Sequence, residues 1–462
     1  MNRRAFLRFG TFGSLLLANS RLIPHAVAAP PRIPNDDALR IAAMCDHIRR
    51  CAMADGALNL VPYRADDDPV LIDPYFGAYG LLALFAENER SQESSPATKA
   101  NLMVIERWLM LGGELMAPDR PLPRNLPYCV DLQSAVMRDE SGAFAGEPLP
   151  KDDVRVYYSL GRVEGHYDRL QNVMKLDRRK LILSDAHDSA AAMYLLVAGL
   201  YAKALKQKMI NPKIKKGAIA AMVILKACAE KEDVFRSFVS PGNPLKQCMD
   251  NFEVHFGLTG AVWFFESFPK EAQCVRLASK AGQMAADLSK RLNVFELQLG
   301  GGSPYFGPLP NDTAALGVQG SHGYTNLMAV ARLDPLPFRD KLFQLVETNP
   351  KIPQEFGNPP DEQRTLPENT YLPFWCLAVN RASLKESRQK YHEMLRSRVS
   401  YLVTQYKVMK QADVRIDNET RFIGRYAFRI QEYGLAVLAI LSEFGPVKQL
   451  PDIPYLAKPE QR

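Results

Sequence analysis

Three acidic residues of this 462-residue chain lie where mainly apolar segments begin. Asp188 precedes Ser-Ala-Ala-Ala-Met-Tyr-Leu-Leu, while Asp250 and Glu253 belong to Met-Asp-Asn-Phe-Glu-Val-His-Phe-Gly-Leu. Asp250 and Glu253 are three positions apart, so they share one face of a helix. Cleavage of a glycosidic bond needs two carboxyl groups, one to protonate the leaving oxygen and one to activate water or attack directly. Helix capping is the structural alternative, with Asp188 as an N-cap and Asp250 with Glu253 as a capping box.

Aromatic, amide and histidine side chains recur at the starts of other apolar segments, as in Ile-Asp-Pro-Tyr-Phe-Gly from residue 72. Aromatic faces can stack on sugar rings, while amides and carboxylates can bind sugar hydroxyls. These residue types therefore favour a carbohydrate ligand. The candidate binding residues are Tyr75, Asn251, His322, Tyr371, Trp375 and Tyr433.

Helices must position these residues, because helical periodicity dominates the chain from residue 36 onward. The segments expected to be helical are 36–54, 74–87, 97–111, 188–207, 212–229, 248–268, 270–292, 321–333, 336–347, 369–380, 384–407 and 425–444. Every second segment is apolar nearly all round, which is typical of a helix buried on all sides, whereas most of the others carry charge on one face. This alternation predicts inner helices surrounded by outer ones.

The predicted fold is all-α, an (α/α)6 barrel of six helical hairpins over residues 36–445. A helical solenoid or an irregular bundle is the alternative. β-branched and aromatic residues interrupt the helical pattern and predict a small β-rich insertion around 153–184. If the inner helices of a barrel run parallel, their N-terminal ends line one rim and gather the acidic and aromatic residues there.

The chain opens with Met-Asn-Arg-Arg-Ala-Phe-Leu-Arg, which resembles a twin-arginine export signal. An apolar run over 9–17 and small residues before position 29 predict cleavage after Ala28. The run is too short to span a membrane, which takes about 20 residues. We expect a signal peptide over 1–28, a Pro-rich lead-in over 29–35 and a Pro-rich tail over 446–462. The twin-arginine translocase is then the export partner, and the mature protein is periplasmic, with no membrane span.

Charge and cysteine usage exclude several classes of protein. Four of the 58 basic residues and none of the 51 acidic residues lie in 1–28, which leaves 54 against 51 and predicts no nucleic-acid partner. The seven cysteines form no CxxC pattern and the histidines form no HxH or HxxxH pair, so no metal site and no cofactor are expected. Most of the cysteines are expected to be small buried hydrophobic residues.

Four sequence blocks resemble bacterial six-hairpin glycosidase-like proteins. They are Ile-Asp-Pro-Tyr-Phe-Gly from residue 72, Glu-Arg-Trp from residue 106, Asp-Ser-Ala-Ala-Ala-Met-Tyr-Leu-Leu from residue 188 and Met-Asp-Asn-Phe-Glu-Val-His-Phe-Gly-Leu from residue 249. The resemblance covers roughly residues 70 to 270 and implies an (α/α)6 barrel. It also implies that Asp188, Asp250 and Glu253 lie in a substrate cleft.

The leading hypothesis is a periplasmic glycoside hydrolase that acts on an oligo- or polysaccharide. One of the three acids would be the general acid, and another the base or nucleophile. A polysaccharide lyase on the same barrel is a second hypothesis, in which Tyr371, Tyr324 or His322 would abstract a proton beside Asn369 or Arg425. A third is a non-catalytic glycan-binding or assembly protein of an envelope polysaccharide system.

Overall fold

The computed structural model describes residues 33–60, 69–72, 74–90, 95–116, 162–168, 171, 173–182, 186–205, 209–230, 234–237, 248–294, 376, 385–409 and 430–444. This part of the chain is mostly helical, as the sequence predicts. Its helices are α1 (Asn35–Arg50), α2 (Pro74–Arg90), α3 (Pro96–Met116), α5 (His187–Ala204), α6 (Pro212–Cys228), α7 (Cys248–Glu266), α8 (Ala272–Val294), α14 (Lys385–Met409) and α16 (Ile430–Glu443). Within these ranges, no helix combines the length and the hydropathy that a membrane span requires.

The helices fall on predicted segments, with ends that follow local sequence signals. α2, α3 and α6 each begin at a proline, which suits the first helical position because its missing N–H would have no partner there. Asn211 caps α6, since its side chain accepts from the Lys213 N–H at 3.0 Å. The predicted segments 321–333 and 336–347 lie outside the described residues, and only position 376 of segment 369–380 is described.

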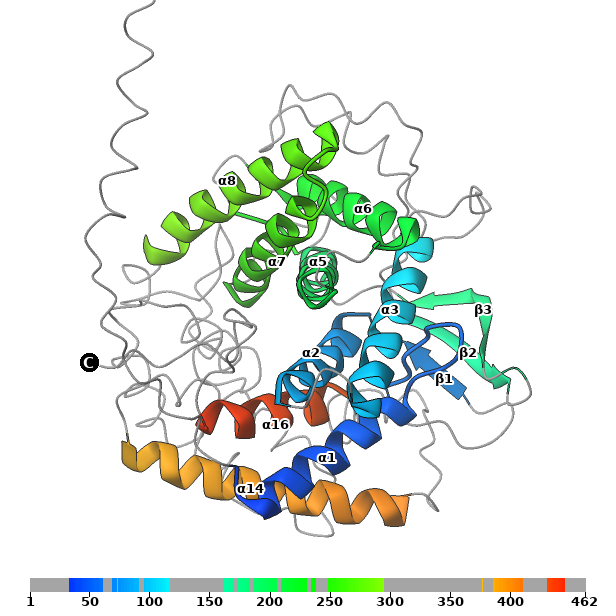
Figure 1. Cartoon of the computed structure of the whole chain (residues 1–462), viewed down its shortest axis with the longest axis vertical. Helices are drawn as coiled ribbons and strands as arrows, with labels where there is room; N and C mark the ends of the chain where they lie inside the picture. Colours follow the sequence, from blue (N-terminus) through cyan, green and yellow to red (C-terminus); the bar gives the residue numbers. More distant parts are fainter. Residues whose placement is uncertain are drawn as a thin grey trace, which may run out of the picture.

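Among the described helices, α16, α2, α5 and α7 form an inner row in that order, each packed on the next (Figure 1). α14, α1, α3, α6 and α8 lie outside this row. Residues 188–202 of α5 are all buried, so this helix has no polar face to present to water. α8 instead exposes charged residues along one side. Apolar and amphipathic segments thus take inner and outer positions in this part of the chain.

Glycine residues let α5 and α7 approach each other closely. A Cβ atom added at Gly257 would lie 2.4 Å from the Ala192 Cα, and one added at Gly260 would lie 2.5 Å from the Leu196 Cα. The contacting positions advance together along the two helices, so α5 and α7 run in the same direction. Their N-terminal ends, which carry the candidate acids, are therefore side by side.

A small antiparallel sheet has the strand order β1 (Pro69–Ile72), β2 (Arg162–Asp168) and β3 (Val173–Ile182) (Figure 1). β2 and β3 lie within the stretch 153–184, where β-branched and aromatic residues gather. The sequence pattern does not single out β1, because four residues directly before a helix are too few to show a strand periodicity. β1 pairs with β2 along its whole length and so links the start of α2 to the later stretch.

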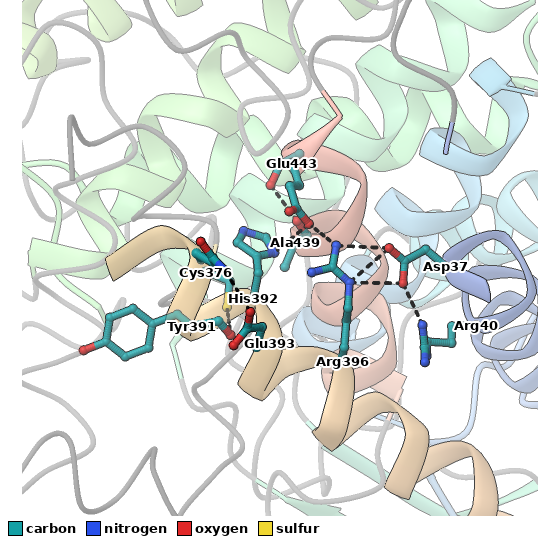
Figure 2. A network of polar contacts seen from close by, with 11 residues as sticks. Asp37, Arg40, Cys376, Tyr391, His392, Glu393, Arg396, Ala439 and Glu443 are labelled. Atoms are coloured by element: carbon teal, nitrogen blue, oxygen red, sulfur yellow. Dashed lines mark hydrogen bonds and ion pairs between the residues drawn. The ribbon is translucent and has the colours of Figure 1, made fainter. Parts of the chain in front are cut away.

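Arg396 on α14 joins helices from opposite ends of the sequence. Its guanidinium binds the Asp37 carboxylate on α1 at 3.1 Å and the Glu443 carboxylate on α16 (Figure 2). Arg40 forms a second ion pair with Asp37 at 2.9 Å, and the His392 Nδ1 lies 3.2 Å from a Glu443 oxygen. Asp37 is 2% exposed, so its guanidinium partners compensate a charge that would otherwise be destabilising. The network holds α1, α14 and α16 together.

Five cysteines have described side chains, and all five are free thiols without exposed surface. They are Cys45, Cys51, Cys228, Cys274 and Cys376. Burial raises the pKa of the Cys51 thiol well above its usual value, so it stays uncharged. The prediction of small buried hydrophobic residues is confirmed for these five.

Replacing Gly260 by alanine is expected to lower the stability of the fold by about 1–3 kcal/mol, because the new methyl group would overlap the backbone of α5. Gly282→Ala on α8 is the matched control, since its methyl group would meet only the Val262 Cγ2 at 3.7 Å. Alanine has the higher helix propensity, so this control should gain up to about 1 kcal/mol. Chemical denaturation measures both changes, and equal effects would contradict the close packing of α5 on α7.

Candidate functional site

The three candidate acids lie at the N-terminal ends of α5 and α7, and we term Asp188, Asp250 and Glu253 the carboxylate cluster. They are 0%, 2% and 0% exposed. Asp188 interacts electrostatically with both other members, so the sequence prediction that these acids converge agrees with the structure. A carboxylate is strongly unfavourable in an apolar interior unless it is protonated, paired or hydrogen-bonded. Each acid is accommodated differently.

Two tyrosines of α2 hold the Glu253 carboxyl group. The hydroxyls of Tyr75 and Tyr79 donate to Glu253 Oε1 at 2.8 Å and 2.5 Å, and the two hydroxyl oxygens are 3.2 Å apart. The tyrosines are four positions apart and share one face of α2. Burial, followed by the neighbouring Glu253, raises the pKa of Tyr75 well above its usual value. Its hydroxyl therefore keeps its proton and remains a hydrogen-bond donor.

Asp250 is bonded to Ser237, which lies in the short segment 234–237. The Ser237 Oγ donates to Asp250 Oδ2 at 2.5 Å. The backbone carbonyl of the same serine accepts from the His187 N–H at 2.7 Å. Ser237 thus connects the first turn of α5 to the first turn of α7 and fixes the spacing of the two helix ends.

Asn251 binds the same segment through its side-chain amide. The amide oxygen accepts from the Phe235 N–H at 2.8 Å, and the amide nitrogen donates to the Phe235 carbonyl at 3.0 Å. Asn251 is completely buried. The structure therefore gives this amide a positioning contact, and the sugar contact predicted for it stays a prediction.

Asp188 lies in the first turn of α5 but does not cap the helix. The cap position is Ala186, where no side-chain cap bond forms. Asp188 Oδ1 accepts from the Ser189 N–H at 2.8 Å, whereas Oδ2 is buried with no hydrogen-bond partner among the described residues. The capping role left open by the sequence is thus wrong for Asp188. One oxygen of its carboxyl group retains hydrogen-bonding capacity for a ligand.

Burial raises the pKa of Asp188 well above its usual value, and the charges of Asp250 and Glu253 raise it further. Asp188 therefore carries a proton at pH values where an exposed aspartate is ionised. Burial also raises the pKa of the nearby Cys228 thiol and lowers the pKa of His187 to about 4. The cluster thus combines a protonated carboxyl group with neutral neighbours and two further acids, which is the combination that acid–base chemistry uses.

Glu432 is a buried acid at the start of another inner helix, α16, and it is accommodated by an ion pair. Arg398 of α14 donates to Glu432 Oε1 from Nε at 2.8 Å, and a second guanidinium nitrogen lies 2.7 Å from the same oxygen. The opposite charge favours the ionised form of a carboxyl group. This ion pair holds the start of α16 against α14.

Tyr433 of α16, a predicted ligand contact, lies in the core that this helix forms with α1 and α14. Its ring is 1% exposed and stacks on the His47 ring at 3.6 Å, and its hydroxyl donates to the Leu402 carbonyl at 3.2 Å. Burial lowers the pKa of His47 to about 3, so the stacked imidazole is neutral. These are contacts of a packed core side chain, and the sugar contact of Tyr433 stays a prediction.

The remaining predicted residues lie outside the described part of the chain. They are the cleavage residue Ala28, the binding candidates His322, Tyr371 and Trp375, and the lyase candidates Tyr324, Asn369 and Arg425. Where the structure describes the chain, no group of three or more His, Cys, Asp or Glu side chains is arranged to hold a metal ion. The described site therefore consists of the carboxylate cluster and its partners.

The sequence pattern does not single out Tyr79 or Ser237 as site residues. A signal for Tyr79 exists, because a second tyrosine one turn after Tyr75 in an apolar helix must find a hydroxyl partner when buried. Ser237 has no comparable signal. It lies in a segment without periodicity and reaches Asp250 only through the fold.

No protein-family model matches the chain, and no curated protein matches it. Solved structures of glycosidases are similar to it at low sequence identity. A wild-type glycosidase matches with a TM-score of 0.43 and 12% identity, and a glycosidase variant in complex with glucose with a TM-score of 0.45 and 11% identity. Each match covers 89% of this chain and 99% of the other.

Asp188→Asn is expected to change how stability depends on pH. The folded protein retains the Asp188 proton above about pH 3.9, where the unfolded chain releases it, so the wild type loses stability as the pH rises. Asparagine removes this loss and can still accept from the Ser189 N–H. The unfolding temperature of the variant should therefore rise relative to wild type between about pH 4 and about pH 7.

Asp287→Asn on α8 is the control with the opposite sign. Hydrogen bonds from Gln283 and Lys290 lower the pKa of Asp287, so its contribution is present at neutral pH and is lost as the pH falls through that pKa. Thermal unfolding from about pH 2.5 to about pH 7 measures both variants, because the change expected for Asp287→Asn lies below about pH 3.9. A constant difference between Asp188→Asn and wild type would contradict the raised pKa of Asp188.

Proposed function

We propose that this protein is a glycoside hydrolase that cleaves an oligo- or polysaccharide with the carboxylate cluster. The observation that carries the proposal is the state of Asp188. This buried carboxyl group has a raised pKa, lies beside two further acids, and has one oxygen without a partner among the described residues. A general acid needs a proton near neutral pH, and hydrolysis needs a second carboxyl group close to it.

In the proposed reaction, Asp188 donates its proton to the leaving glycosidic oxygen as the bond from that oxygen to the anomeric carbon breaks. Asp250 or Glu253 activates water or attacks the anomeric carbon. The positive ends of the α5 and α7 helix dipoles stabilise the carboxylate that Asp188 becomes. The cluster is buried, so the reaction requires that the sugar gains access to it.

We further propose that the inner and outer rows belong to a closed (α/α)6 barrel. The alternation of inner and outer helices supports it, as does Arg396, which links α1 to α14 and α16. The segments 321–333, 336–347 and 369–380 would then supply the missing helices. The stretch 153–184 would be an insertion in this barrel.

Side chains at the same rim are proposed to bind the sugar. His322, Tyr371 and Trp375 are the candidates from the segments that would complete the barrel. The Tyr75 hydroxyl is already bonded to Glu253 at 2.8 Å, so Tyr75 is better suited to hold this carboxyl group than to stack on a ring.

We also propose that residues 1–28 form a twin-arginine signal that is cleaved after Ala28. Arg3, Arg4 and the short apolar run behind them support export through the twin-arginine translocase. The mature protein would then act on a polysaccharide in the bacterial periplasm. Residues 29–35 and 446–462 would flank its barrel.

Asp188→Asn and Glu253→Gln should each lower kcat/KM at least about 100-fold, because general acid–base groups typically contribute about 10²–10⁴-fold. A panel of oligosaccharides, polysaccharides and nitrophenyl glycosides, assayed for released reducing ends, identifies the substrate. Asp287→Asn removes a carboxylate from α8 and should keep full turnover. Undiminished turnover in both cluster variants would refute the assignment.

Two other outcomes of the same panel would replace the proposal. Products that absorb in the ultraviolet, from a new C=C bond, would identify a lyase. Binding of a glycan in calorimetry without any product over days would identify a glycan-binding protein.

Replacing Arg3 and Arg4 together by lysine should abolish export, because lysine keeps the charge but not the planar guanidinium group. Cell fractionation and mass spectrometry of the N-terminus measure the effect. Wild type should be periplasmic and begin at Ala29, whereas the double variant should stay full-length in the cytoplasm. Arg21→Lys is the control and should be exported normally, and a periplasmic double variant would argue against this route.

A further inference from the structure

We infer that Tyr79, together with Tyr75, is a positioning residue that holds Glu253 in its ionised form as the partner of the proton donor Asp188. The inference deepens the proposed hydrolase and rests on it for the role of Asp188. The ionised state of Glu253 can be tested without any substrate.

Both tyrosine hydroxyls donate to the same atom, Glu253 Oε1. Hydrogen bonds to an ionised acceptor are short and roughly twice as strong as neutral ones, and the Tyr79 bond is 2.5 Å long. The two donors belong to α2, whereas Glu253 belongs to α7. The carboxyl group therefore cannot turn without breaking two bonds to another helix.

Asp250 has a different set of contacts. Its Oδ2 accepts from Ser237, and the adjacent Asn251 binds the backbone of Phe235 in the same segment. Asp250 therefore helps to fix the segment 234–237 against α7. Glu253 is bonded to the side chains of α2 instead, which makes it the better candidate for the base or nucleophile.

Titratable groups from several elements face the cluster. Tyr75 and Tyr79 come from α2, Asp188 from α5, Cys228 from α6 and Asp250 from α7 itself. Burial raises the pKa values of Tyr75 and Cys228, so both stay neutral in mildly acidic and neutral solution. Changes in charge at this site between about pH 3 and about pH 7.5 therefore come from the carboxyl groups and from His187, whose pKa burial lowers to about 4.

Tyr79→Phe removes one donor and keeps the ring. Thermal unfolding of the mature chain at about pH 7.5 and about pH 3 should show a Tm loss roughly twice as large at the higher pH, where the acceptor is charged. Tyr194→Phe is the matched control, because this buried hydroxyl donates to the neutral Leu109 carbonyl at 2.8 Å. Its loss should be the same at both pH values. An equal loss at both pH values for Tyr79→Phe would overturn the inference.

A second pair of variants keeps the test decisive if Tyr79→Phe does not fold. Tyr75→Phe removes the other donor and should show the same dependence on pH. Glu253→Gln replaces the charged acceptor by a neutral amide, so either tyrosine variant made in that background should lose its dependence on pH. If the dependence on pH persisted in the Glu253→Gln background, the charged acceptor would not be its source and the inference would fail.

Kinetics test the positioning role once a substrate is known. Tyr79→Phe should lower kcat about tenfold with KM nearly unchanged, and the acid limb of its pH profile should move to higher pH, because an ionised Glu253 becomes harder to form. Tyr194→Phe should change neither. A change in KM alone would overturn the role of Tyr79. Absence of turnover in wild type would refute the hydrolase, while the Tm comparison would still decide the state of Glu253.

Discussion

A carboxylate loses its hydration when it enters an apolar interior, and this loss constrains the contacts of the buried acids in this protein. The buried acids compensate this loss in three ways, by keeping a proton, by accepting hydrogen bonds or by forming ion pairs. Asp188 keeps its proton, Asp250 accepts from a serine, and Glu253 accepts from two tyrosines. Glu432 and Asp37 are paired with arginines. The arginine pairs join helices to one another, whereas the acids at the ends of α5 and α7 have no arginine in these contacts.

The position of the cluster follows from how closely the inner helices pack. Glycines bring the backbones of α5 and α7 into contact, and Gly434 does the same for α16 against the Tyr79 carbonyl of α2. Close backbones leave little space between neighbouring helix ends. Polar side chains near these ends can therefore bond across helices, and this is what Tyr79 does when it reaches Glu253.

The sequence was sufficient to predict the described helices, because their apolar and amphipathic patterns differ clearly. It was also sufficient to bring Asp188, Asp250 and Glu253 together, since each lies where an inner helix begins. It could not distinguish a cap from a buried acid at Asp188, because both readings place an acid near a helix start. That distinction depends on Ala186 occupying the cap position, which is a property of the backbone path.

Partners that come from distant parts of the chain could not be predicted either. Tyr433 has the residue type of a sugar platform, but its ring stacks on His47 because α1 and α16 pack together. Ser237 reaches Asp250 from a segment with no regular pattern. Both contacts depend on tertiary packing, which local periodicity does not record.

The link between Arg396 and Asp37 has a consequence for how the protein is made. The two residues are 359 positions apart in sequence, so a ribosome must synthesise most of the chain before the first helix can meet this partner. Contacts with such long sequence separation form late, since a large loop must close first. Until then Asp37 has only its local ion pair with Arg40. Nascent chains that end before α14 would lack the arginine that links α1 to α16.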